Sequence, residues 1–149
     1  MNDHPPADTD AIHRTLYRYA ELVDAGDFGA VGALFADADI VVGDDVVGHG
    51  ADFVEGMLRA MVILYDDGTP RTRHLISNPI IEFADADSAR IRSCYTVLQP
   101  RDGRIEVIAV GRHHDTMRRT GDGWAFTSRD YGLLDFTGDT SGHLRGGTR

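Results

Sequence analysis

Residues 16–39 read LYRYAELVDAGDFGAVGALFADAD, and this stretch indicates two helices with a stop between them. Before Gly26, apolar residues recur at helical spacing, so residues 10–25 are predicted to form an amphipathic helix. Asp27 is the expected N-cap of a shorter second helix. A third helix is predicted at about residues 51–65, and its apolar face is expected to consist of Phe53, Met57, Met61 and Leu64.

Alternation of apolar and polar residues predicts a run of strands after these helices. The expected strands cover about residues 40–47, 73–83, 88–98, 104–119 and 124–131. Turns that contain glycine join the last three, as in antiparallel hairpins. Helices first and antiparallel strands afterwards indicate an α+β domain, in which the helices pack on one face of a curved sheet.

Composition and charge limit the class of protein. The chain has 149 residues, 42% of them apolar, with no apolar run of membrane-spanning length, so we expect one cytoplasmic domain without a signal peptide. The domain is predicted to cover residues 8–135, with flexible tails at residues 1–7 and 138–149, because these ends have little apolar content. A net charge of -9 opposes binding to nucleic acids and acidic membranes.

Two residues carry the strongest indication of chemistry. Asp24 ends the first helix in YRYAELVDAGD, and His74 begins a strand in RTRHLISN. A carboxylate at a helix C-terminus is electrostatically unfavourable, which favours a function beyond structure. A histidine can accept a proton at neutral pH, and a carboxylate bonded to its other ring nitrogen fixes the tautomer. If the fold joins them, Asp24 and His74 are expected to form a general acid–base dyad.

Four further residues are predicted to support this dyad at a substrate: Tyr19, Tyr95, His113 and Arg129. Tyr95 lies on the inward side of its strand, whereas His113 and His114 point to opposite faces, so at most one of them serves a pocket. We favour His113. Arg129 has an equal claim to be an ion-pair partner. Tyr19 is first a core tyrosine that needs a hydrogen bond, and only secondly a proton donor.

Alternation leaves two orientations open in the later strands. Ile108 and Val110 are as apolar as their strand neighbours, so a partner subunit is expected to cover the outer face of the sheet. In the final strand, either the face with Arg129 or the face with Trp124 and Phe126 lines the concave side.

The remaining reactive residues give weaker indications. Cys94 is the single cysteine, and we expect a small buried or interface thiol rather than a nucleophile. No metal is predicted, because no HExxH motif or Cys/His cluster is present, and no organic cofactor is predicted, because the acid–base chemistry needs none. The other histidines are assigned to tails, exposed faces or loops: His4, His13, His49 and His143.

The segments LYRYAELVDAGDFGAVGALFADAD, TRHLISNPIIEF and VGRHHDTMRRTGDGWAFTSRDY resemble the SnoaL-like branch of the nuclear transport factor 2-like superfamily. The motif is most similar to the lyase group of scytalone dehydratase, bile acid 7α-dehydratase and hexachlorocyclohexane dehydrochlorinase. This resemblance implies a cone-shaped α+β barrel, with three helices on a mainly antiparallel sheet, and a catalytic Asp24–His74 dyad. It also implies that Tyr19 lines the pocket and that Arg129 matches a functional arginine. His113 stands where this group often has tyrosine or phenylalanine.

The resemblance and the dyad together predict a cofactor-independent lyase of the dehydratase type. Its substrate is expected to be a bulky apolar cyclic molecule, such as a polyketide, steroid or aromatic intermediate. The same proton abstraction would serve a polyketide cyclase or isomerase. A non-catalytic binding or assembly subunit, like the small subunit of a ring-hydroxylating dioxygenase, is the other alternative. We expect a homodimer or homotrimer in either case.

Overall fold

The computed structural model describes residues 5–121 and 123–149, so the predicted N-terminal tail lies largely outside the described residues. The described residues form three helices: α1 (Pro6–Asp24), α2 (Phe28–Leu34) and α3 (Ala51–Met61). They pack on a single sheet of seven strands: β1 (Asp39–Val42), β2 (Asp45–His49), β3 (Arg73–Phe83), β4 (Ser88–Arg101), β5 (Arg104–Thr120), β6 (Gly123–Asp130) and β7 (Leu134–Thr137).

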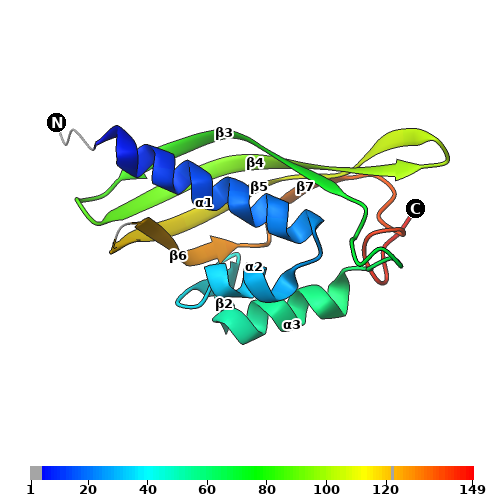
Figure 1. Cartoon of the computed structure of the whole chain (residues 1–149), viewed down its shortest axis with the longest axis horizontal. Helices are drawn as coiled ribbons and strands as arrows, with labels where there is room; N and C mark the ends of the chain where they lie inside the picture. Colours follow the sequence, from blue (N-terminus) through cyan, green and yellow to red (C-terminus); the bar gives the residue numbers. More distant parts are fainter. Residues whose placement is uncertain (1–4, 122) are drawn as a thin grey trace.

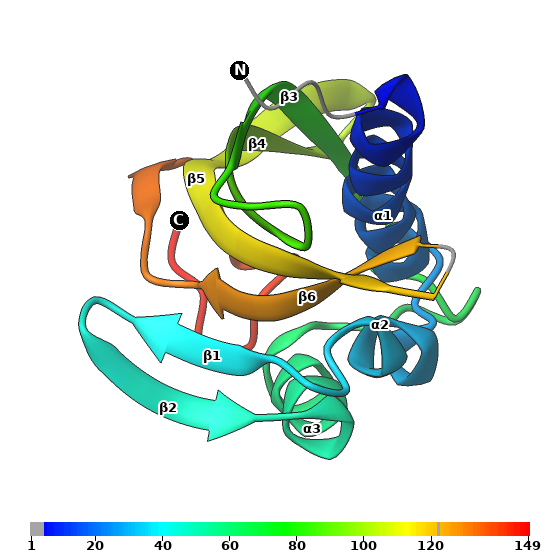
Figure 2. The ribbon, with the colours of Figure 1, turned by 90° about the vertical axis from the view of Figure 1, so that its left-hand side faces the viewer.

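The sheet is curved and mixed. Its strand order is β2-β1-β6-β5-β4-β3, with β7 paired to β5, and only the β1–β6 pair is parallel. Figure 1 shows α1 running along the long strands, and the end view in Figure 2 shows the sheet curving around the helices without closing. The predicted α+β class is therefore confirmed. The strand expected at residues 40–47 is instead the β1–β2 hairpin, because Gly43 adopts a positive φ of 63° between them.

The end of α1 is determined by Gly26. Its φ is 73°, and an added Cβ would lie 2.2 Å from the carbonyl oxygen of Gly68, so only glycine fits. Asp27 then caps α2 as expected, since its Oδ1 accepts a hydrogen bond from the amide of Ala30 at 3.1 Å. This tight connection holds Asp24 at the end of α1, beside β3.

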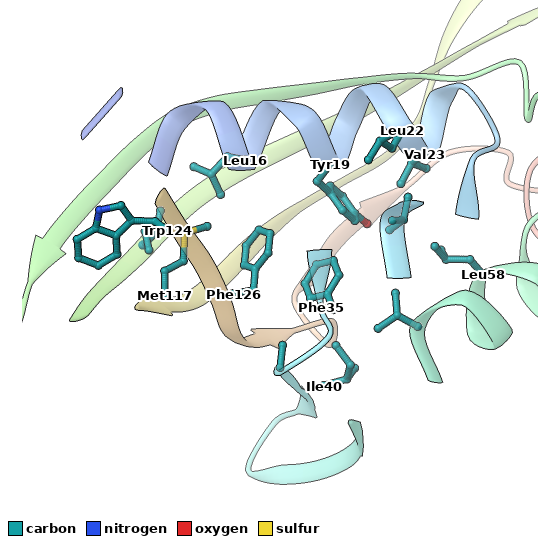
Figure 3. Close-up of a cluster of buried hydrophobic side chains, with 14 of the residues drawn as sticks. Leu16, Tyr19, Leu22, Val23, Phe35, Ile40, Leu58, Met117, Trp124 and Phe126 are labelled. Atoms are coloured by element: carbon teal, nitrogen blue, oxygen red, sulfur yellow. The ribbon is translucent and has the colours of Figure 1, made fainter. Parts of the chain in front are cut away.

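The hydrophobic core fills the space between the helices and the concave side of the sheet. In Figure 3, Tyr19 of α1 faces Phe35 and Phe126, and the rings of Phe35 and Phe126 stack at 4.5 Å. Helix α3 contributes Val54 and Leu58 to this core.

Of the apolar face predicted for the third helix, Phe53 packs against the core, but the end of the predicted face is wrong. Met61 and Leu64 are exposed, and α3 ends at Met61. Two adjacent lines of residues along this helix are apolar. The buried line contains Val54 and Leu58, each of which directly follows a residue of the predicted face.

β-bulges reset the alternation of the long strands. Ala109 pairs with Val97 and Val107 with Leu98, which leaves Ile108 as an extra residue. Ile108 is buried within the chain, so it gives no reason for a partner subunit, contrary to the sequence-based expectation.

In β6, Thr127 is the extra residue opposite the bond between Thr116 and Met117. Trp124 and Phe126 before this bulge and Arg129 after it are consequently all buried. Strict alternation would place either Arg129 or the pair Trp124 and Phe126 on the concave side. The bulge allows all three residues to line that side.

The segment at residues 138–149 is not the tail that composition predicted. The amide of Ile63 donates to the carbonyl of His143 at 2.8 Å, and Val62 forms a β-bridge with Leu144. The side chain of Gln99 also donates to the carbonyl of Gly142 at 3.0 Å. The prediction failed because backbone hydrogen bonds, which apolar content does not report, hold much of this segment. Among the described residues, no helix has the length and apolar character needed to cross a membrane.

Candidate functional site

The structure brings Asp24 and His74 together. Nδ1 of His74 lies 2.6 Å from Oδ1 of Asp24, and each side chain is only 9% exposed. The backbone amide of His74 donates to Oδ2 of Asp24 at 2.8 Å, and the Thr72 hydroxyl donates to Oδ1 at 2.9 Å. Three donors therefore hold the carboxylate and offset its unfavourable place at a helix C-terminus.

These contacts define the protonation of the dyad. Burial raises the pKa of Asp24, but the hydrogen bonds and charge of His74, with the hydroxyl of Thr72, outweigh burial and lower the pKa. An ionised carboxylate only accepts hydrogen bonds, so Nδ1 of a neutral His74 must carry the proton. Nε2 then has a lone pair. Within the described part of the chain Nε2 makes no hydrogen bond, so this nitrogen is available as a base.

Arg129 forms an ion pair with Asp115, and one of its nitrogens has no hydrogen-bond partner among the described residues. Its side chain is fully buried, and Nε and Nη2 donate to Asp115 at 2.7 and 2.9 Å. Burial lowers the pKa of Arg129, but Asp115 outweighs burial, so the pKa is raised and the residue stays charged. The guanidinium lies 4.3 Å from the ring centroid of Tyr19. Nη1 is buried and has no partner among the described residues.

His113 faces the interior and His114 is exposed, as opposite strand faces require. The His113 ring stacks on Tyr95 at 4.5 Å and meets Tyr19 edge-on at 5.8 Å. Burial, then the charges of Arg129 and His74, place the pKa of His113 well below its usual value. His113 is therefore neutral, and its buried Nδ1 has no partner among the described residues.

Tyr95 completes the set of residues selected from the sequence. Its ring is half-buried, and burial, together with the neighbouring Tyr19, raises the pKa of its hydroxyl. The hydroxyl is therefore protonated at neutral pH and can donate a hydrogen bond. The structure thus places Tyr19, Tyr95, His113 and Arg129 in one interior cluster. The charge of His74 contributes to the lowered pKa of His113.

Several residues of this region were not selected from sequence patterns, among them Thr72, Asp115, Tyr131 and His143. Asp115 lies two residues after His113 on the same face of β5, so alternation could have placed it beside the cluster. His143 belongs to the supposed tail, and no periodic pattern pointed to it. Its ring is 6.2 Å from that of His74.

Acid should destabilise the protein through His143. Burial, then the nearby His74, lowers the pKa of His143 from 6.5 to about 4. Between these pH values the unfolded chain binds a proton that the folded protein does not, so stability falls as the pH falls from 6.5 to 4. The loss amounts to about 3 kcal/mol. Urea denaturation across this range should give a shallower pH slope for His143→Leu than for wild type or His114→Leu. Equal slopes would contradict this prediction.

Other reactive groups lie apart from the dyad. Cys94 is half-buried in β4, and its position in the strand alternation is opposite to that of Ser93 and Tyr95. Across residues 5–121 and 123–149, no three histidine, cysteine or acidic side chains are grouped as a metal site would require.

Comparisons with known proteins place this chain in a family. A family model described as a SnoaL-like domain matches residues 6–130. No curated protein shows similarity to the chain. A candidate scytalone dehydratase from Novosphingobium aromaticivorans has a similar structure, with a TM-score of 0.72 and 23% identity, over 93% of this chain and 91% of that chain.

Two further solved structures have the same fold. LinA has a TM-score of 0.66 at 19% identity, over 88% of each chain. The beta subunit of a candidate aromatic-ring-hydroxylating dioxygenase from Novosphingobium aromaticivorans has a TM-score of 0.65 at 19% identity, over 90% of this chain and 94% of that chain. These likenesses establish the shared fold. Because the family model covers most of the sequence, the chain belongs to the SnoaL-like domain family, within the nuclear transport factor 2-like fold.

Proposed function

We propose that this protein is a cofactor-independent lyase of the dehydratase type, in which His74 is the general base and Asp24 orients it. The observation that carries this proposal is the 2.6 Å contact between Nδ1 of His74 and Oδ1 of Asp24, with Nε2 left unpaired in the described structure. A histidine used only for packing would not require a buried carboxylate held by three donors.

The proposed reaction removes water from a β-hydroxy carbonyl compound. Nε2 of His74 takes a proton from the carbon next to the carbonyl, and the electron pair of that C–H bond forms the new C=C bond. The C–O bond to the β-hydroxyl breaks, and its electrons leave with the oxygen. The imidazolium of His74 returns the proton to this oxygen, which departs as water. Atoms and charge balance without a co-reactant.

The interior composition supports an apolar cyclic substrate. The rings of Tyr19, Tyr95 and His113 are suited to a flat apolar molecule. Nη1 of Arg129 is an unpaired buried donor that can hold the carbonyl oxygen as negative charge develops on it. We therefore assign the carbonyl end of the substrate to Arg129 and the reacting carbon to His74.

A bicyclic β-hydroxytetralone tests this assignment, because dehydration and tautomerisation convert it to an aromatic naphthol with a new ultraviolet absorbance. We expect turnover by wild type without an added cofactor, and loss of turnover in His74→Gln. Isomerisation would change the spectrum without loss of water, which mass spectrometry detects, and would support the cyclase or isomerase alternative. Binding without any reaction would support the non-catalytic alternative and overturn the proposed function.

The proposal includes self-association through an apolar surface. Ile105 and Val107 of β5, and Leu134 and Phe136 of the paired β7, are exposed, with Phe136 72% exposed. A second copy of this chain is the proposed occupant. Light scattering should give a dimer or trimer mass for wild type and a smaller mass for Phe136→Arg. A wild-type monomer at micromolar concentration would overturn this part of the proposal.

A further inference from the structure

His143 is a buried histidine that the proposed dyad does not use. Its side chain is 7% exposed, and its ring lies 6.2 Å from the ring of His74, at an interplanar angle of 65°. Nδ1 of His143 is buried and has no hydrogen-bond partner in the described part of the chain. An unpaired polar atom in a protein interior is costly unless it serves a ligand or a water molecule.

The backbone around His143 is held by several hydrogen bonds. The carbonyl of His143 accepts from Ile63 at 2.8 Å, and its amide donates to Thr140 at 3.0 Å. The neighbouring carbonyl of Gly142 accepts hydrogen bonds from Tyr65 and Gln99. Figure 1 shows the C-terminal segment beside the connection from α3 to β3, which leads directly to His74. The fold therefore fixes His143 next to the dyad at considerable cost in chain ordering.

We propose that His143 is a third active-site residue, whose imidazole hydrogen-bonds the hydroxyl that leaves the substrate. This assignment rests on the proposed function and deepens it. In that reaction His74 both removes the proton and returns it to the departing oxygen, so this oxygen must lie beside His74. His143 lies beside His74, and its buried Nδ1 has no hydrogen-bond partner among the described residues.

The separation of the two rings suits one shared substrate oxygen. The centroids of the two rings are 6.2 Å apart, so a substrate oxygen at a hydrogen-bond distance of about 2.9 Å from a nitrogen of one ring can also lie next to the other ring. A neutral His143 does not compete with His74 for the abstracted proton, and burial keeps its pKa low. The carbonyl end of the substrate and its leaving hydroxyl thus have different partners, Arg129 and His143. The inferred substrate class is a ring that carries both groups.

His143→Leu and His143→Asn separate hydrogen bonding from packing. Leucine fills the site without a polar atom, whereas the asparagine amide nitrogen takes approximately the place of ring Nδ1. With β-hydroxytetralone, we expect His143→Leu to lose on the order of 10²-fold in kcat. We expect His143→Asn to recover most of this loss. Unsubstituted tetralone, which lacks the hydroxyl, should bind His143→Leu and wild type equally in calorimetry. Exposed His114→Leu is the matched control and should keep wild-type turnover.

Three outcomes would overturn the role of His143 alone. These are full kcat in His143→Leu, an asparagine variant no better than leucine, or a loss of tetralone binding as large as the loss of turnover. The last would mean that the ring only fills space. Failure of wild type to dehydrate β-hydroxytetralone is a different result, because it overturns the proposed function on which this role rests.

Discussion

Asp24→Asn is expected to lower kcat for dehydration by about 10²- to 10⁴-fold without unfolding the protein. The backbone amide of His74 donates to Oδ2 and cannot change its orientation, so the amide oxygen of asparagine must occupy that position. The NH₂ group then faces Nδ1 of His74 and makes Nδ1 an acceptor. The proton moves to Nε2, and the base is lost while the geometry remains.

The measurement compares kcat for wild type, Asp24→Asn and Asp10→Asn, with Tm as the test of folding. Asp10 lies on the same helix and is exposed, so its variant should behave like wild type. His74→Gln should be no more active than Asp24→Asn, because residues that act as a unit do not contribute additively. A fully active Asp24→Asn would show that the tautomer of His74 does not matter, and the dyad mechanism would be rejected.

The dyad was predictable because each partner has a strong local signal. Gly26 ends the helix directly after Asp24, and alternation begins at Arg73, so both residues occupy element ends that the pattern marks clearly. No local pattern predicts that Asp24 and His74 meet, because α1 packs against β3 through contacts between residues distant in sequence. The family resemblance supplied that information.

The interior cluster was less predictable because single-residue bulges change which side chains share a face. Strict alternation would put Arg129 and Phe126 on opposite faces, but the extra residue Thr127 brings both inside. The hydroxyl of Thr116 lies 2.6 Å from those of Thr127 and Ser128, so polar contacts accommodate the bulge. Such contacts join two neighbouring strands, β5 and β6, and have no periodic signature.

His143 was missed for another reason. Composition reports whether a segment can bury apolar surface, and residues 138–149 have little to bury. The segment is held instead by backbone hydrogen bonds to residues near the end of α3. Any residue type can make such bonds, so a glycine-rich sequence does not indicate that its histidine lies beside His74.

Asp115→Ala is expected to destabilise the protein by about 3–5 kcal/mol, because it leaves the fully buried charge of Arg129 without its partner. Asp115 accepts from two nitrogens of Arg129, while Nη1 has no partner in the described structure, so the variant would leave the whole guanidinium unpaired. The surrounding rings of Tyr19 and Phe126 replace only part of the lost stabilisation. Urea denaturation measures the difference.

Asp135→Ala is the matched control, since Asp135 also receives two nitrogens of an arginine, Arg112, but at an exposed site. Water screens that pair, so its loss should change stability far less. The double variant Asp115→Leu/Arg129→Met removes both buried charges and should recover much of the stability, yet it should not recover turnover, because the donor for the carbonyl is gone. If Asp115→Ala cost no more than Asp135→Ala, the buried charge would have found another partner, and Arg129 could not hold the substrate as proposed.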